Sequence, residues 1–377
     1  MKNLYFLIIS LCICLGFTSS NVTAQNKITA QFHPDSWEIK AVKHEFKDYK
    51  GKHALYLENG RALLKNSNFK NGIIDYDVSF EKGRKFIGVH FRIQDSINYE
   101  EYYLRAHQSG NPDAMQYTPV FNGTAGWQLY YGEGHSTSYH FNFEEWMHIR
   151  LVIANNKMDI FINDMSQPIL HVHDLKMETI KGGLGFNTLL GGAYFANLTY
   201  QPMDNPNLMS SMEKLPESDK GTILQWKVSS PFSKNQLSKV NNLKDFPLSK
   251  KIEWEILSTE YTGTLNLSKL SQVSKETNTV LVKAVIISEK NQIKRLDFGF
   301  SDVATVFVND KIIYSGQRKF RSRDYRYLGT IGYFDSIFLH LKKGKNEITF
   351  AITENFGGWG LKAKLENLEG VSLEKNR

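Results

Sequence analysis

The feature that most constrains the fold is a series of short stretches, along nearly the whole chain, in which polar and apolar residues alternate. Successive side chains of a β-strand point to opposite faces, so alternation is typical of a strand with one buried face. Turn-forming residues separate these stretches at regular intervals, and no helical period replaces the alternation. The pattern predicts an all-β protein made of two antiparallel β-sandwich (jelly-roll) domains.

Breaks in this pattern divide the chain into parts. The first 24 residues combine Lys2, an apolar run over residues 4–17 and a small-x-small end at Val22-Thr23-Ala24, which is typical of a secretory signal peptide. Residues 201–221 contain three prolines and no periodicity, which is typical of a linker. We therefore expect a signal peptide at 1–24, a first sandwich at 25–200, a linker at 201–221 and a second sandwich at 222–377. The protein is expected to be secreted or periplasmic.

The sequence also excludes several classes of chemistry. Both cysteines, Cys12 and Cys14, lie in the expected signal peptide, so the mature chain would have no disulfide, catalytic thiolate or Cys-ligated metal. No later apolar run is long enough to cross a bilayer, and no nucleic-acid-binding motif is present. We expect no metal site and no cofactor, with a structural calcium ion held by loop oxygens left open.

Short strands separated by glycines are expected in the first sandwich, among them residues 53–57 and 61–64, and residues 182–186 and 192–200. The clearest alternation is in a hairpin formed by Phe86–Ile93 and Tyr99–Arg105, joined by a turn at residues 95–98. Counting by twos predicts one face that carries His90, Arg92, Glu101, Tyr103 and Arg105, and a core face that carries Val89, Phe91, Tyr102 and Leu104.

The polar face and the segment after it combine flat rings with planar hydrogen-bonding groups. A sugar ring offers an apolar face that stacks on aromatic side chains and a rim of hydroxyls that pairs with polar ones. We therefore predict carbohydrate binding by Arg92, Glu101, Tyr103, Arg105, His107, Gln116, Trp127, Gln128 and Tyr130. The alternatives are a cross-strand salt-bridge ladder for the strand residues and a core position for Trp127.

The second half of the chain is basic. Residues 221–377 contain 25 Lys and Arg against 16 Asp and Glu. Residues 318–327 concentrate cations among aromatic residues, and arginine forks match planar oxyanions. Candidate residues for an anionic ligand are therefore Arg318, Arg321, Arg323 and Arg326. An equally open alternative is a solvated loop with ion pairs to Asp335 or Glu354.

Short motifs in both halves are similar to those of known families. The first half contains Gly88-Val89-His90-Phe91-Arg92, Tyr99-Glu100, Gly126-Trp127, Glu145-Trp146, Phe161-Ile162-Asn163 and Phe195-Ala196-Asn197-Leu198. On these motifs, residues 26–200 resemble the concanavalin A-like lectin/glucanase superfamily, in its laminin-G-like and 3-keto-disaccharide-hydrolase-like branches. The resemblance implies two curved sheets with a concave face that binds glycans, and in some members cleaves them. The E-x-D-x-x-E strand of the glucanase branch is absent.

The second half carries Ala304-Thr305-Val306-Phe307-Val308-Asn309, a Leu-x-x-Gly-x-Asn segment that starts at Leu341, and Phe356-Gly357-Gly358-Trp359-Gly360. On these residues it resembles a galactose-binding-like jelly roll, a module often attached to carbohydrate-active enzymes.

Together these observations predict an exported protein that recognises a polysaccharide or oligosaccharide, anionic ones included, through the concave face of the first sandwich. The alternative is a glycoside hydrolase or lyase acting on a disaccharide or modified glycan, with Glu101 and Asp113 as acid/base candidates and His107 as helper. A third possibility is an adhesion module that has a protein partner and no affinity for saccharides.

Overall fold

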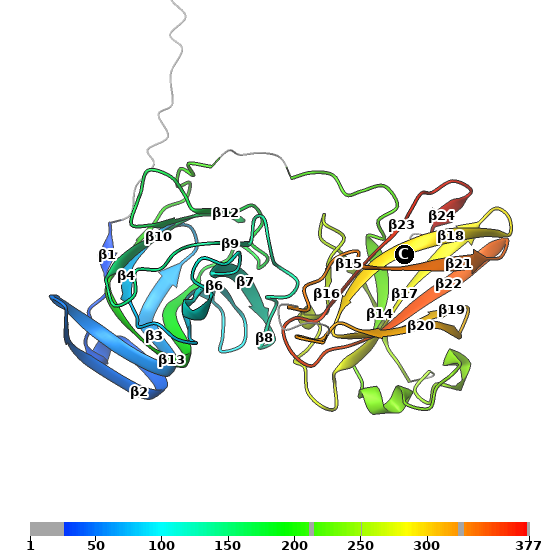
Figure 1. Cartoon of the computed structure of the whole chain (residues 1–377), viewed down its shortest axis with the longest axis horizontal. Coiled ribbons are helices and arrows are strands. Elements are labelled where there is room, and N and C mark those ends of the chain that lie inside the picture. The colour runs from blue at the N-terminus through cyan, green and yellow to red at the C-terminus, as the bar shows by residue number, and fades with distance from the viewer. Residues whose placement is uncertain (1–25, 211–214, 250, 323–327, 375–377) are drawn as a thin grey trace, which may run out of the picture.

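The computed structural model describes residues 26–210, 215–249, 251–322 and 328–374. The expected signal peptide at 1–24 lies outside these residues. Within them the protein is all-β, and the only helical segments are 3₁₀ turns of three or four residues. No helix in the described part of the chain is long and apolar enough to cross a membrane. Two antiparallel β-sandwiches lie next to each other along the long axis of the molecule (Figure 1).

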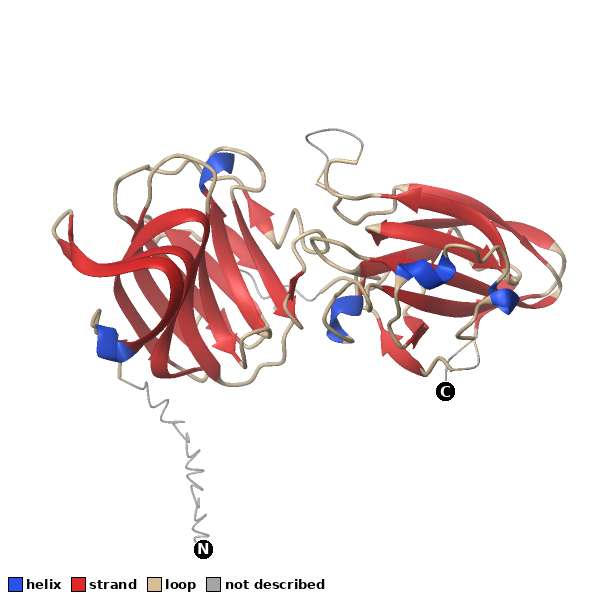
Figure 2. Ribbon diagram, turned by 90° about the horizontal axis from the view of Figure 1, so that it is seen from below, coloured by secondary structure: helices blue, strands red, loops and turns tan. Residues whose placement is uncertain are grey.

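The first sandwich is a single antiparallel sheet that curls back on itself. One layer contains β5, β6 and β7, the other contains β4, β10, β11 and β12, and the long strands β3 and β13 run through both. Figure 2 shows the curled strands of this sandwich. Its strands are β1 (Ile28–Thr29), β2 (Trp37–Tyr49), β3 (Lys52–Phe69), β4 (Gly72–Ser79), β5 (Phe86–Ile93), β6 (Tyr99–Arg105), β7 (Met115–Phe121), β8 (Thr124–Ala125), β9 (Ser136–Thr137), β10 (Met147–Ala154), β11 (Lys157–Ile162), β12 (Leu170–Val172) and β13 (Gly182–Pro202).

The strand β13 joins the two layers. Its first half pairs with β5 and its second half pairs with β4, while β3 follows it on the other side through both halves. Between the halves the pairing with β3 shifts register from Thr188 to Gly192, and both Leu190 and Gly191 have positive φ. An irregularity of this kind bends a strand and increases its twist. The sheet therefore folds over at this point without interrupting the strand.

The core of the first sandwich is rich in aromatic residues. Phe186 and Phe195, from the two halves of β13, stack with ring centres 4.2 Å apart. Trp37 of β2 stacks on Phe186, and Tyr76 of β4 packs against the same Phe186 ring. Burial of these side chains between the two layers is the main favourable contribution to the free energy that holds the layers together.

The second sandwich packs a seven-stranded sheet on a four-stranded one around Trp226, Trp359 and Phe298. Its strands are β14 (Gln225–Ser229), β15 (Trp254–Ser258), β16 (Leu265–Asn266), β17 (Thr279–Ser288), β18 (Gln292–Ser301), β19 (Val303–Val308), β20 (Lys311–Gln317), β21 (Asp335–Leu341), β22 (Gly344–Thr353), β23 (Gly360–Leu365) and β24 (Val371–Leu373). The larger sheet consists of β14, β15, β17, β19, β20, β22 and β24, and the smaller one of β16, β18, β21 and β23.

Candidate functional site

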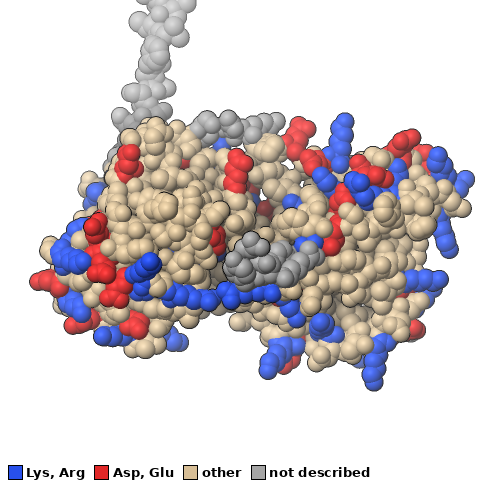
Figure 3. Space-filling view, in the orientation of Figure 1, with Lys and Arg blue, Asp and Glu red and all other residues tan. Residues whose placement is uncertain are grey.

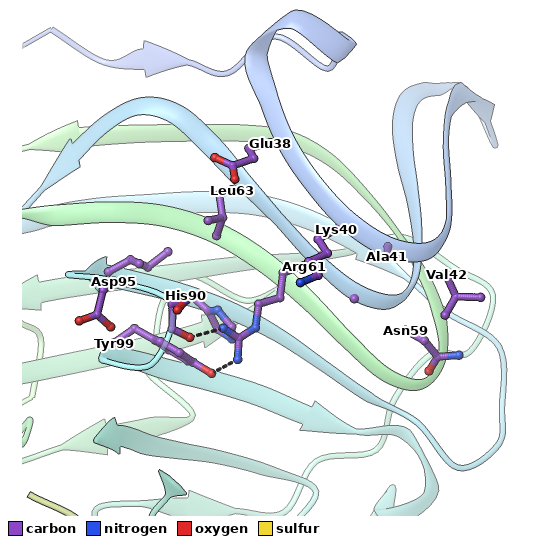
Figure 4. A pocket seen from close by; sticks show the side chains of 13 residues that line it. Glu38, Lys40, Ala41, Val42, Asn59, Arg61, Leu63, His90, Asp95 and Tyr99 are labelled. Carbon is purple, nitrogen blue, oxygen red and sulfur yellow. Dashed lines mark hydrogen bonds between the residues drawn. The ribbon is translucent and has the colours of Figure 1, made fainter. Parts of the chain in front are cut away.

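A pocket of about 640 Å³ lies between the β2–β3 hairpin and the polar face of β5, at the turn that leads into β6 (Figure 4). Strand β2 forms one wall and strand β3 runs beneath it. The apolar lining includes Ala41, Val42, Leu63 and Ile93. The polar and aromatic lining includes Glu38, Lys40, Arg61, His90, Asp95 and Tyr99.

The hairpin has this shape because β2 and β3 cross closely at Gly60. A Cβ added to Gly60 would lie 2.2 Å from the Cα of Ala41, which no side chain could tolerate without a backbone shift. Ala41 and Gly60 are register partners. Small residues at this pair therefore allow the two strands to arch over β5 and leave the pocket beneath them.

His90 forms part of the pocket floor and is almost completely buried. Its ring stacks on Tyr99 with ring centres 4.1 Å apart, and its Nε2 lies 3.3 Å from Oε1 of Glu101. The Nδ2 group of Asn187 donates to the same carboxylate oxygen over 2.9 Å. Burial lowers the pKa of His90, and this effect outweighs the opposing effect of Glu101. The imidazole is therefore neutral at pH 7, with Glu101 fixing its orientation.

Arg61 reaches the floor from β3. It donates through Nη1 to the carbonyl of Ser96 over 2.7 Å and through Nη2 to the hydroxyl of Tyr99. Its guanidinium carbon also lies 4.8 Å from the centre of the Tyr99 ring. Burial raises the pKa of Tyr99, so its hydroxyl keeps its proton at neutral pH. The pocket floor thus combines the half-buried guanidinium of Arg61 with a buried phenol and a buried neutral imidazole.

Arg61 and Tyr99 were not among the expected ligand residues. Arg61 meets this site because β13 lies between β3 and β5, with Asn187 opposite both Arg61 and Gly88. A Cβ on Gly88 would lie 2.1 Å from the Asn187 side chain, so a glycine is needed there. The glycine in the middle of an otherwise alternating strand was the one sequence signal for this close approach.

The predicted division of the hairpin into two faces is correct for most positions. Val89, Phe91, Tyr102 and Leu104 lie in the core of the first sandwich. His90 and Glu101 are register partners on the opposite face.

Arg92 is on the wrong face in the prediction. Its φ of +50° lies in the left-handed region and breaks the alternation at the end of β5. The side chain turns toward the core side, where Nε donates to the carbonyl of Lys70 over 2.8 Å and Nη2 donates to Asn71 over 3.1 Å. It lies 4.0 Å from the carboxylate of Glu100, and both side chains are fully buried. Arg92 therefore does not contribute to a surface ligand site.

Tyr103, Arg105 and Gln116 are on the expected face, but the protein itself uses their polar groups. Arg105 donates to the hydroxyl of Tyr103, to Oε1 of Gln116 and to the carbonyl of Asp113. Gln116 in turn donates to the carbonyls of Trp127 and Tyr130. All three side chains are buried beneath the segment that holds these two carbonyls. Their polar groups are therefore satisfied within the protein, in an internal network.

Gln128 and Tyr130 join the two sandwiches. Gln128 is fully buried, donates through Nε2 to the carbonyl of Leu328 over 2.7 Å, and accepts a hydrogen bond from Ser301 over 3.0 Å. The hydroxyl of Tyr130 donates to Glu260 and accepts from Asn266. The expected role of these two residues in ligand binding is corrected to one in the junction between the sandwiches.

Trp127 is half-buried at the same junction. Its ring makes edge contacts with Phe320 at 5.9 Å and Phe356 at 5.8 Å, both from the second sandwich. The second sandwich thus occupies part of the ring surface that was expected to stack on a sugar.

The acid/base pair proposed from the sequence is not assembled. Asp113 lies near Arg105, with 4.0 Å between Nη1 and Oδ2, whereas Glu101 contacts His90 and Asn187. Register places Glu101 opposite Thr118, five residues from Asp113, which is roughly 16 Å along a strand. Glycoside-cleaving carboxylates lie about 5–10 Å apart. His107, the expected helper, packs edge-on against Phe86 beyond the end of β6.

The arginines expected to bind an anion are also placed differently. Arg318 is buried, and its Nε donates to Asp335 over 2.6 Å, which is one of the ion pairs considered as the alternative. Arg321 is exposed, with its guanidinium carbon 5.0 Å from the ring centre of Phe320. Arg323 and Arg326 lie outside the described residues. The described residues contain no group of three or more His, Cys, Asp or Glu side chains arranged to hold a metal ion.

Comparison with known proteins gives similarities in structure alone. No family model matches the sequence, and no curated protein matches it. A carbohydrate-binding module of Bacillus subtilis, CBM66, is 15% identical, with 43% of this chain and 93% of that one covered and a TM-score of 0.33. A Bacillus subtilis protein of unknown function with a galectin-like fold is 12% identical, with coverage of 44% and 89% and a TM-score of 0.33. A β-glucanase of Bacillus licheniformis is 8% identical, with coverage of 48% and 98% and a TM-score of 0.34.

Proposed function

We propose that the protein binds carbohydrate in the pocket between the β2–β3 hairpin and β5. The observation that carries this proposal is the combination of Arg61, His90 and Tyr99 on the floor of a pocket of about 640 Å³. Ligand pockets typically measure about 300–1,000 Å³ and combine apolar walls with a few fixed polar groups. Here Val42 and Ile93 supply apolar surface for the C–H face of a sugar.

The polar groups suit hydroxyls because they are held in place before any ligand arrives. Arg61 is tied to Ser96 and Tyr99, and His90 is tied to Glu101. Side chains that are already ordered lose little conformational entropy when they bind a ligand. The hydroxyl of Tyr99 accepts from Arg61 and keeps its own proton, which it can donate to a sugar oxygen.

A glycan array with the full chain tests this proposal. We expect retention of one class of saccharide, reduced about 5–10-fold in Tyr99→Phe because one hydrogen bond is lost. Val42→Trp should block the mouth of the pocket, since this side chain is 79% exposed. Ile293→Trp, at an exposed position on β18 of the second sandwich, is the matched control and should bind as wild type. Absence of any saccharide binding by the wild-type protein would refute the proposal.

Cleavage of the glycan is a second candidate, and the His90–Glu101 contact favours it. A neutral imidazole oriented by a carboxylate is an arrangement that can accept a proton from a substrate. Incubation with a panel of glycans, followed by detection of new reducing ends or unsaturated products, measures this activity. Cleavage is established if the products disappear in Glu101→Gln while binding is unchanged. If the wild-type protein leaves every glycan intact, cleavage is ruled out and only the binding function remains.

We also propose that the protein is exported, because residues 1–24 have the pattern typical of a secretory signal peptide. Amino-terminal sequencing of the exported protein should give Gln25 as the first residue. A start at Met1 in the exported fraction would contradict this.

A further inference from the structure

We infer that the carbohydrate is an acidic polysaccharide whose chain leaves the pocket along a basic path onto the second sandwich. This inference rests on the function proposed above and adds the class of ligand and its direction. It is carried by three cations, Lys40 of β2, Arg61 of β3 and Lys269, which is the last residue of the 3₁₀ turn η5 (Leu267–Lys269) in the second sandwich.

None of these three cations has a carboxylate within salt-bridge distance among the residues that the structure describes. Other cations of the protein are neutralised in place: Lys52 lies 2.6 Å from Asp77, Lys176 lies 2.7 Å from Glu260, and Arg150 lies 2.7 Å from Asp75. Lys40 and Lys269 are also exposed. Their charge is therefore available to an anionic ligand.

A continuous series of contacts leads from the pocket to Lys269. The pocket rim includes Asp95 and Ser96, in the turn between β5 and β6. In the same turn the carbonyl of Ile97 accepts from Gly123, and Asn98 accepts from the backbone of Asn122, in the turn between β7 and β8.

The next contact crosses to the second sandwich. The side chain of Asn122 donates to the carbonyl of Ser268 over 2.9 Å and to that of Lys269 over 3.3 Å. The ammonium of Lys269 lies 5.1 Å from the centre of the Phe121 ring, at the end of β7. Lys269 is therefore held over the first sandwich, on the side that continues from the pocket rim.

In Figure 3 a row of Lys and Arg side chains crosses the lower part of the visible face, from the first sandwich toward the second. Rows of like charge spaced along a surface raise the local concentration of a polyanion and guide it onto the protein.

Two acids, Asp95 and Glu38, also line the pocket and offset part of this charge. Asp95 accepts hydrogen bonds from the backbone of Ile97 and the side chain of Asn98, so its carboxylate faces its own turn. Glu38 lies on β2 two residues from Lys40, and it is exposed. Replacement of Glu38 by glutamine should therefore strengthen the binding of an acidic ligand.

Affinity electrophoresis of the full chain in gels that contain polygalacturonate, its methyl-esterified form, dextran sulfate or dextran tests this inference. We expect polygalacturonate to bind at least ~10-fold more tightly than its neutral ester at low salt, and this preference to fall as salt screens the charges. Dextran sulfate distinguishes a general preference for anions from one for carboxylates. Lys269→Glu should weaken polygalacturonate binding about 10-fold or more, since one attraction becomes a repulsion.

Lys290→Glu is the matched control. Lys290 is an exposed lysine in the turn before β18, at the opposite end of this strand from Ser301 and the junction, and its replacement should change nothing. Equal binding of the acid and its neutral ester, or unchanged binding in Lys269→Glu, would overturn the acidic-ligand inference and leave carbohydrate binding intact. Retention of none of the four polymers, together with an empty glycan array, would remove the proposed function itself.

Discussion

The hydroxyl of Ser301, in the second sandwich, donates a hydrogen bond over 3.0 Å to the side-chain carbonyl of Gln128, in the first. The backbone of Gln128 continues the contact, since its N–H donates to Gly357 and its carbonyl accepts from Ile331, each over 2.9 Å. One glutamine is thus surrounded by four residues of the other sandwich once Leu328 is included. The two sandwiches are held together by specific, buried contacts.

Truncation of Gln128 should therefore destabilise the whole chain. In Gln128→Ala the carbonyl of Leu328 and the hydroxyl of Ser301 lose their partner in a buried position. We expect the free energy of unfolding to fall by about 2–5 kcal/mol. Urea denaturation followed by tryptophan fluorescence measures this, with the exposed Gln31→Ala as control. A loss equal to that of the control would mean that the junction contributes no stability.

The glycine at position 357 should be essential to the same junction. A Cβ there would lie 2.3 Å from Oε1 of Gln128, and its φ is +110°. Gly344 has a φ of +95° but nothing within 4 Å of an added Cβ, so Gly344→Ala measures the backbone penalty alone. We expect Gly344→Ala to cost about 1–2 kcal/mol and Gly357→Ala to cost at least ~2 kcal/mol more, because the clash adds to the strain. Equal losses in the two variants would show that Gln128 moves aside without cost.

Arg92 and Glu100 should behave as a coupled pair. Both are fully buried, so removal of either takes away the opposite charge that lies nearest to the other. Arg92→Met is expected to lower the free energy of unfolding by about 3–5 kcal/mol. The double variant Arg92→Met with Glu100→Gln should lose less than the sum of the single losses, by about 1 kcal/mol or more. Additive losses in urea denaturation would argue against coupling.

A pH-dependent contribution to stability is expected from His148 on β10. Hydrogen bonds with Asp75 and Asp77 raise its pKa to about 9. Because the folded pKa lies above the unfolded value, this stability is fully present below about pH 6.5 and is lost as the pH rises through 9. His148→Gln should remove the loss between pH 6.5 and 9. Titration of the imidazole by NMR with a midpoint near 6.5 would contradict the prediction.

Asp75 should act at the other end of the pH scale. Burial raises its pKa, but hydrogen bonds from His148 and Arg150 outweigh burial and lower the pKa to about 2. The stability from this carboxylate is therefore present above about pH 4 and is lost as the pH falls through 2. Asp75→Asn should flatten the acid limb of a plot of unfolding free energy against pH. If the acid limb is unchanged, the loss of stability at low pH comes from other carboxylates.

The all-β class follows from the sequence because alternation is a local property of the chain. The core face of the β5–β6 hairpin was predicted correctly for the same reason. Trp146 lies at the start of an alternating stretch, yet it is only half-buried and donates to the carbonyl of Lys50. Alternation tells which residues share a face, but it does not tell which face is covered.

Strand continuity was less predictable. Residues 53–57 and 61–64 were expected to be separate strands, as were residues 182–186 and 192–200, because glycines interrupt them. In the structure these pairs form the single strands β3 and β13, which keep their pairing while the backbone bends at the glycines. A glycine can end a strand or bend it, and only its neighbours in the sheet decide which.

The site itself depended on contacts that are distant in the sequence. Arg61 is brought to Tyr99 by strands that are separated along the chain, and no local pattern encodes that register. The error at Trp127, Gln128 and Tyr130 has a different cause. Aromatic rings and planar amides suit a sugar, and they suit a polar domain junction equally well, so composition could not separate the two roles.

The position of β13 in the chain has a consequence for biosynthesis. This strand pairs with β1, β3, β4 and β5, yet it is the last strand of the first sandwich to be made. Until the chain has been made as far as residue 202, β3, β4 and β5 lack the strand that pairs with each of them, and several strand edges remain open to pairing with other chains. We therefore expect nascent chains that end before β13 to depend on chaperones. Chains that extend past β13 are expected to form the first sandwich without chaperones.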